Sequence, residues 1–178
     1  MKYTEKQMEE KAILDTASCM CAAARTAPKA RGIDNIITLV LTGTEKDFLA
    51  DKMDEINNRE FEGTSAIFPR DAKNLRSSQA VVLIGVKSVY AGLKFCSFCG
   101  FENCDKCKKE GGRCAYNMIN LGIALGSAVS IAADNRVDNR IMYTIGKAVA
   151  EMKYADDSVV WHGIPISISG KNIFFDRK

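Results

Sequence analysis

Apolar residues recur along the chain at helical or strand spacing and so divide it into a series of predicted elements. Residues 4–7 have the pattern of an N-terminal capping box, and apolar positions three or four apart continue to about residue 26, which predicts a first helix. The short β-branched run 36–41 and the continuous apolar run 80–86 predict buried strands. The other predicted elements are a helix over 45–58, a helical turn at 71–75 within an irregular stretch 60–78, helices over 115–133 and 138–153, and a strand within 158–169.

This order of elements favours a mixed fold. Helices and strands alternate before and after a cysteine-rich segment, which indicates an α+β fold built as an α/β sandwich. The length of 178 residues suits a single domain over 1–178, with a cysteine-rich module over 94–114 inserted within it.

The helix predicted over 115–133 is apolar or small on nearly every side, so we expect it to be central or to lie at a subunit interface. Gly122, Gly126 and Ser130 follow one another at a spacing of four, which lets another backbone approach closely. Tight packing is the favoured interpretation of this stripe, ahead of a ligand site. The apolar character of the whole helix predicts a homodimer, with burial inside a monomer as the alternative.

Composition and charge exclude several classes of protein. The chain has 25 Lys and Arg residues against 22 Asp and Glu, and a net charge of +3 gives no reason to expect binding to nucleic acid. The N-terminus lacks the layout of a secretory signal, and no run reaches the roughly 18 apolar residues of a membrane span. We therefore expect a cytoplasmic protein, in whose reducing surroundings clustered cysteines are metal ligands or redox groups.

Five of the seven cysteines are concentrated in one short segment with the spacing C-x2-C-x4-C-x2-C-x6-C: Cys96, Cys99, Cys104, Cys107 and Cys114. A two-residue gap lets two sulfurs face one centre, and several thiolates in one place require a cation to neutralise their repulsion. Basic residues outnumber acidic ones around them: Lys94, Lys106, Lys108, Lys109 and Arg113 stand against Glu102, Asp105 and Glu110. This balance would help to hold an anionic cluster.

Two kinds of metal centre fit this spacing. Four thiolates can hold an iron–sulfur cluster, or they can hold a structural zinc ion. Zinc fingers and ribbons place their cysteine pairs about 12 to 20 residues apart, whereas four residues separate the pairs here, which favours iron–sulfur. A cluster of the [4Fe–4S] type is the form expected, but five cysteines allow several sets of four ligands. Cys114, at the start of a helix, is the alternate ligand to the other four.

The remaining candidates are interpreted as structural. Cys19 and Cys21 lie two apart on a helix and so face different sides of it. His162 is the only histidine, lies in a predicted strand and is interpreted as structural, which argues against a nucleophile–His–acid site. The sequence names no catalytic residue and leaves open whether the chain is an enzyme. If the protein is an enzyme, we expect an oxidoreductase.

Four segments carry a resemblance to a known family: residues 23–34, the five-cysteine block, residues 120–146 and residues 163–177. With these the chain resembles a prokaryotic family described as ferredoxin-domain-containing proteins of unknown function. The resemblance spans nearly the whole chain and implies an iron–sulfur protein with an electron-transfer role, whose redox partner protein or small-molecule electron donor is unidentified. The alternative is a non-enzymatic protein in which a zinc knuckle serves binding or assembly.

A weaker resemblance is to the fold of FMN-dependent nitroreductases. Those proteins have an early helix, an Ala-Pro loop, a long apolar helix that builds a homodimer, and a C-terminal strand, and here Ala27-Pro28 follows the first helix. The resemblance implies a flavin coupled to the cluster, with the phosphate held by Arg25, Lys29 and Arg31. The early arginine-rich flavin motif of nitroreductases is missing, and a solvated basic loop is the other interpretation of these three cations.

Overall fold

A computed structural model describes residues 1–155 and 158–175, so the last residues of segment 163–177 lie outside the described part. The helices are α1 (Glu5–Thr26), η1 (Ala30–Gly32), α2 (Gly43–Phe61), α3 (Ile67–Ser77), α4 (Cys104–Lys109), α5 (Ala115–Asp134) and α6 (Tyr143–Glu151). The strands are β1 (Ile36–Thr42), β2 (Ala80–Lys87), β3 (Asp138–Asn139) and β4 (Val159–Ser167).

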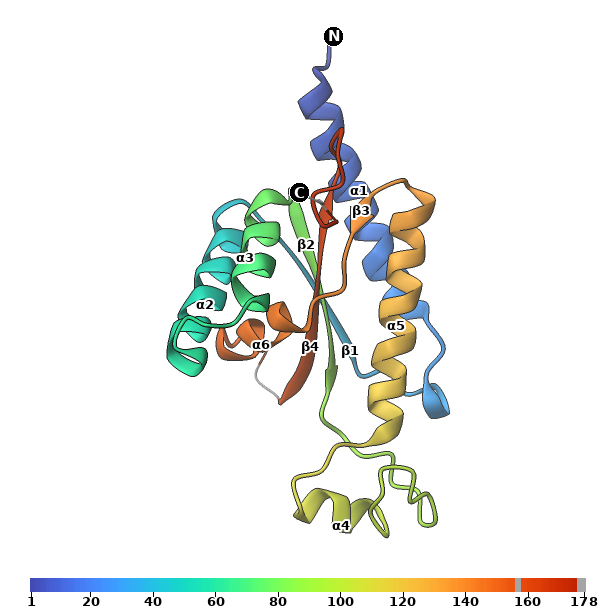
Figure 1. Ribbon diagram of the computed structural model, residues 1–178. Helices are drawn as coiled ribbons and strands as arrows, with labels where there is room; N and C mark the ends of the chain where they lie inside the picture. Colours follow the sequence, from blue (N-terminus) through green and yellow to red (C-terminus); the bar gives the residue numbers. More distant parts are fainter. Residues whose placement is uncertain (156–157, 176–178) are drawn as a thin grey trace.

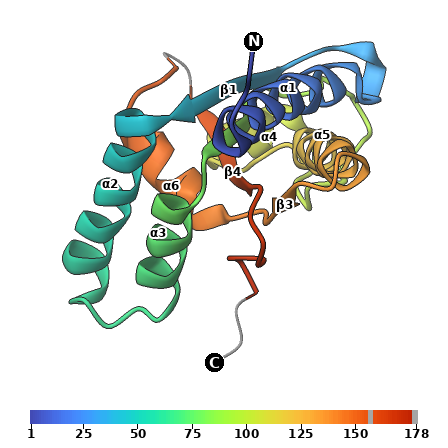
Figure 2. The same cartoon turned by 90° about the horizontal axis from the view of Figure 1, so that it is seen from above.

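The four strands form one antiparallel sheet in the order β1-β2-β4-β3. Strand β2 lies in its centre and is buried along nearly its whole length, as its continuous apolar run predicts. Helices cover both faces, with α1 and α5 on one side and α2, α3 and α6 on the other (Figures 1 and 2). The expectation of an α+β sandwich is confirmed.

Alternate residues of β2 divide the core into two halves. Val82 and Ile84 point to the cluster formed with α1 and α5, whereas Val81 and Leu83 belong to the cluster formed with α2, α3 and α6. Close approach of α6 to β4 depends on Gly146, because a Cβ atom there would lie only 1.8 Å from the backbone oxygen of Trp161. The helix therefore packs directly on the strand backbone.

Most predicted elements are confirmed, and two are wrong in part. The capping box at Thr4 and Gln7 is formed. The stretch 60–78 is more ordered than expected, because Phe68, Ala72 and Leu75 form a buried helical face and Pro69 falls in the first turn of α3, where proline is tolerated.

The predicted helix over 138–153 begins later than expected. Residues 138 and 139 pair with the edge of β4, and Met142 exchanges two backbone hydrogen bonds with Gly163. This pairing holds the chain extended until α6 starts at Tyr143. The sheet edge decides this boundary, and no local pattern reveals it.

Helix α5 is buried on one side only. Leu121, Ala124 and Ala128 pack into the core, while Ile119 and Ile123 are exposed. In the described part of the chain α5 alone is long and apolar enough to cross a membrane, a test that the core helix of a soluble protein also passes. Its contacts with α1 and β2 cover one side of the helix and leave the opposite side uncovered.

Candidate metal centre

The cysteine-rich module connects β2 to α5 and projects from one end of the sandwich (Figure 1). The side-chain amide of Asn117 in α5 donates to the backbone oxygens of Lys87, at 3.1 Å, and of Val89. The hydroxyl of Tyr90 donates to the backbone oxygen of Gly112 at 2.8 Å. The bonds of Asn117 tie the segment that enters the module to α5, and the bond of Tyr90 joins this segment to the end of the module.

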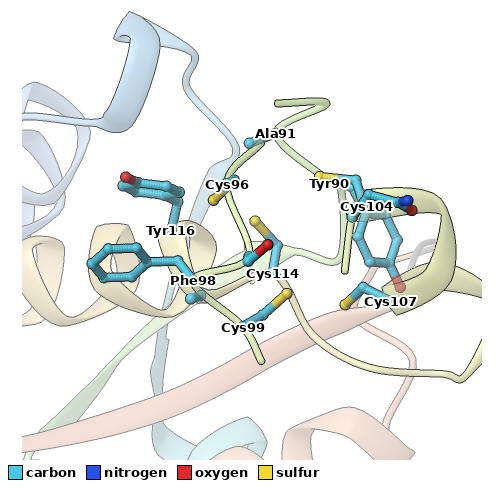
Figure 3. A pocket seen from close by; sticks show the side chains of 12 residues that line it. Tyr90, Ala91, Cys96, Phe98, Cys99, Cys104, Cys107, Cys114 and Tyr116 are labelled. Atoms are coloured by element: carbon cyan, nitrogen blue, oxygen red, sulfur yellow. The ribbon is translucent and has the colours of Figure 1, made fainter. Parts of the chain in front are cut away.

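All five cysteines of the module line one cavity (Figure 3). Cys96 and Cys99 come from the loop, Cys104 and Cys107 from α4, and Cys114 is the N-cap residue of α5. Aromatic side chains complete the wall: Tyr90, Phe98 and Tyr116. All seven cysteines of the chain are free thiols.

Local backbone structure places these thiols. Helix α4 was not predicted, although Asn103 is a recognisable N-cap whose side chain accepts from the backbone N–H of Lys106 at 2.9 Å. Because Cys104 and Cys107 are three apart on this helix, they share one face. The loop before it turns through Ser97 and Gly100, both with positive φ angles. The module thus consists of a turn followed by a short helix.

Two of the thiols have shifted pKa values. The backbone N–H of Phe101 lowers the pKa of Cys99, because it favours the thiolate. Burial and the neighbouring Cys99 raise the pKa of Cys107 to about 11. A bound cation is needed to make a buried thiol such as Cys107 a thiolate ligand.

The five thiols supply the chemistry of a thiolate-bound metal centre. In a tetrahedral zinc site, Zn–S bonds of about 2.3 Å put the sulfurs only about 3.8 Å apart. Within residues 1–155 and 158–175, no three His, Cys, Asp or Glu side chains gather at the spacing of a single metal ion. Five thiols around one cavity can supply the four ligands of an iron–sulfur cluster or of a structural zinc ion.

The three cations predicted to hold a flavin phosphate lie in different surroundings. The ammonium of Lys29 is buried and donates to backbone oxygens at the end of α1, among them that of Ala27 at 2.7 Å. Arg25 pairs with Asp34 at 3.0 Å and donates to the backbone oxygen of Ile36. Both side chains therefore stabilise the loop between α1 and β1.

Arg31 lies apart from these two and reaches the segment that leads into the module. It donates to the backbone oxygen of Ala91 and lines a cavity of about 250 Å³. Asn120 and the aromatic side chains of Tyr90 and Tyr116 also line this cavity. Because both tyrosines also line the cysteine cavity, the two cavities share a wall.

The remaining candidates stay outside the site. Cys19 is exposed on α1, while Cys21 is half-buried beside Thr38, so the two face different surroundings as expected. His162 lies in β4, and its buried Nδ1 atom has no hydrogen-bond partner among the described residues. Burial lowers the pKa of this imidazole.

Sequence comparison identifies a close relative. The chain is 41% identical over 185 residues to an uncharacterized protein of Archaeoglobus fulgidus, and the alignment covers 99% of this chain and 98% of the relative. Residues 110–177 match the sequence profile of a family described as "uncharacterized protein containing a ferredoxin domain". That match includes Cys114 and begins after the other four cysteines of the module.

Solved structures with a similar fold include FMN-dependent nitroreductases, at low sequence identity. A putative NADH dehydrogenase/NAD(P)H nitroreductase of Bacteroides thetaiotaomicron has a TM-score of 0.58 at 12% identity, covering 96% of this chain and 77% of that one. A nitroreductase with bound FMN from Desulfitobacterium hafniense has a TM-score of 0.59 at 10% identity, covering 88% and 78%. An FMN-dependent nitroreductase of Mycobacterium smegmatis in complex with NADPH gives 0.59 at 12% identity, again covering 88% and 78%. The chain thus belongs to the family of proteins described as containing a ferredoxin domain, and its body has a nitroreductase-like fold.

Proposed function

We propose that this protein binds an iron–sulfur cluster through its cysteine-rich module and transfers electrons. The observation that carries the proposal is that five cysteines, from a loop, a short helix and the start of α5, line a single cavity. The ligands proposed are Cys96, Cys99, Cys104 and Cys107, with Cys114 as the alternate. The bound cluster would supply one-electron redox chemistry.

The surrounding residues suit an anionic centre in three ways. The N–H of Phe101 already favours the thiolate form of Cys99. Five Lys and Arg side chains in the module stand against three carboxylates, and one of these, Glu110, pairs with Lys106 at 3.3 Å. Phe98 stacks on Tyr116 with ring centroids 5.6 Å apart and forms an apolar wall. Such a wall limits water access, which is one way a protein sets a reduction potential.

A flavin is the second cofactor to test. The nitroreductase-like fold supports it, but two of the three predicted phosphate contacts are already used, because Arg25 pairs with Asp34 and Lys29 caps α1. We therefore propose that FMN, if the chain takes it, is held near Arg31. Quenching of FMN fluorescence on titration with the protein tests this: Arg31→Ala should abolish the quenching, and Lys73→Ala on α3 should leave it unchanged.

We also propose a homodimer formed through α5. The exposed side of this helix carries Ile119, Gly122, Ile123 and Gly126, and in the fold it has no covering element among the described residues. Two copies packed along this stripe would remove it from water.

We expect the electron donor or acceptor of the cluster to be a redox protein or a small molecule.

An absorption spectrum of protein purified without oxygen, with iron, sulfide and zinc counted on the same sample, tests the proposed function. We expect broad visible absorbance that bleaches on reduction, with equal amounts of iron and sulfide. Single Cys→Ser variants in the module should lower the iron content, whereas Cys19→Ser, an exposed cysteine on α1, should not. A colourless protein with one zinc per chain would overturn the redox role and favour the binding or assembly role.

A further inference from the structure

A third cavity, of about 320 Å³, lies between the module and the body on the side of β4. Its polar lining consists of Ser88 after β2, Ser158 before β4, Asn117 in α5, and Lys108 and Arg113 in the module. The rest of the lining comes from Val89, Tyr90, Gly111, Gly112, Cys114 and Met118. Its volume matches the lower end of the range for small-molecule sites.

The charged side chains described around this cavity are cations. Among the described residues, its lining contains two cations and no carboxylate. Neither Lys108 nor Arg113 forms an ion pair with any acidic side chain in the described part of the chain, unlike neighbouring Lys106, which pairs with Glu110. Two unpaired cations at one concave site attract a negatively charged group.

The cations and hydroxyls are arranged as donors. Arg113 donates one hydrogen bond to the hydroxyl of Ser88, which also lies 3.4 Å from the hydroxyl of Ser158. A guanidinium has five N–H donors, so four remain for a ligand after this bond. The ammonium of Lys108 brings three more. Because Ser88 fixes Arg113, the guanidinium is held in place before a ligand arrives.

We propose that this cavity binds the oxyanion group, phosphate or carboxylate, of a small molecule. Arginine recognises planar or tetrahedral oxyanions through paired hydrogen bonds, and lysine adds a point charge. The uncapped first turn of α5 starts at Cys114 in the same wall and contributes the positive end of the helix dipole.

The position of this cavity relates it to the metal centre. Tyr90 and Cys114 line both the third cavity and the cysteine cavity. A molecule held at Lys108 and Arg113 would therefore lie against one of the proposed ligands. The anion site itself depends only on the lining residues and does not require the metal to be iron.

Isothermal titration calorimetry of the full chain, kept free of oxygen and at constant ionic strength, tests the site. Pyrophosphate and succinate are the two probes, so a preference for one distinguishes phosphate from carboxylate recognition. We expect saturable binding of at least one probe. Lys108→Gln should weaken it about tenfold, as should Arg113→Gln, since each removes a charge-assisted contact.

Lys109→Gln is the matched control, because it removes the same charge from the next residue, which is exposed and does not line the cavity. It should change the affinity by less than about twofold. Absence of saturable binding for both probes, or an equal loss in Lys109→Gln and Lys108→Gln, would overturn the site. Iron, sulfide and zinc are counted in every sample, so that anion binding and the identity of the metal are judged separately. A zinc-loaded protein that binds pyrophosphate through Lys108 would support the anion site and refute the iron–sulfur proposal.

Discussion

Gly112 lies directly against Cys107. Its backbone N–H donates to the backbone oxygen of Cys107 at 2.8 Å, and a Cβ atom added to it would lie 2.9 Å from the sulfur of Cys107 and 2.5 Å from the ring of Phe101. Only glycine fits there without displacing a proposed metal ligand. We therefore expect Gly112→Ala to lower the bound metal per chain severalfold, measured by metal analysis after anaerobic purification.

Gly111 offers the control for this prediction. It has a φ angle of 68°, a backbone conformation that asparagine tolerates. Among the described residues, none outside its immediate chain neighbours would come within 4 Å of a Cβ atom added there. Gly111→Asn should therefore retain the metal content of the parent protein. Equal metal content in Gly112→Ala and the parent would show that the contact with Cys107 does not constrain the site.

Thr144 and Asp71 form a buried hydrogen bond that joins α6 to α3. The hydroxyl of Thr144 donates to the Asp71 carboxylate at 2.7 Å, and Asp71 is only 2% exposed. Thr144→Val keeps the shape but removes the donor, so it should lower the free energy of unfolding by about 1–3 kcal/mol. Denaturant titration measures this, and Thr64→Val in an exposed loop should change it by less than about 0.5 kcal/mol.

His162 makes the fold sensitive to acid. Burial lowers its pKa below the ordinary value of 6.5, so the unfolded chain takes up a proton at a higher pH than the folded one. The contribution of His162 to stability is therefore complete above about pH 6.5 and is lost as the pH falls through the lowered folded-state pKa. Thermal unfolding of His162→Gln from pH 7.5 to 5 should show a smaller loss of stability than that of the parent. Parallel curves would contradict this prediction.

Ile123 tests the proposed dimer. It lies on the uncovered side of α5, 39% exposed, and an aspartate there would place a charge in a dry interface. Sedimentation should show a dimer for the parent and a monomer for Ile123→Asp. Leu14→Asp on α1, a comparably exposed apolar residue on another element, should stay dimeric. A monomeric parent protein would exclude α5 as a subunit interface under these conditions.

The local sequence determined the elements whose signals are local. Local sequence was enough to predict three elements, because backbone preference and burial agree there. They are the start of α1 from its capping box at Thr4, strand β1 from its β-branched run, and strand β2 from its apolar run. The spacing of the five cysteines predicts a thiolate centre, and the fold brings all five to one cavity. Helix α4 could also have been predicted, because Asn103 is a residue type that favours the N-cap position directly before a helix.

Tertiary structure decided what depends on distant partners. Pairing of Met142 with Gly163 delays α6, and the docking of α3 orders a stretch that looks irregular by itself. Packing also gave the three cations of the basic loop different roles. Arg25 pairs with Asp34 and Lys29 caps α1, whereas Arg31 lines a cavity. Lys108 and Arg113 come to line one cavity with Ser158, which lies more than 40 residues further along the chain, only in the folded protein. The sequence determines which chemical groups the protein carries. Tertiary contacts determine which of these groups are engaged by the fold and which line a cavity.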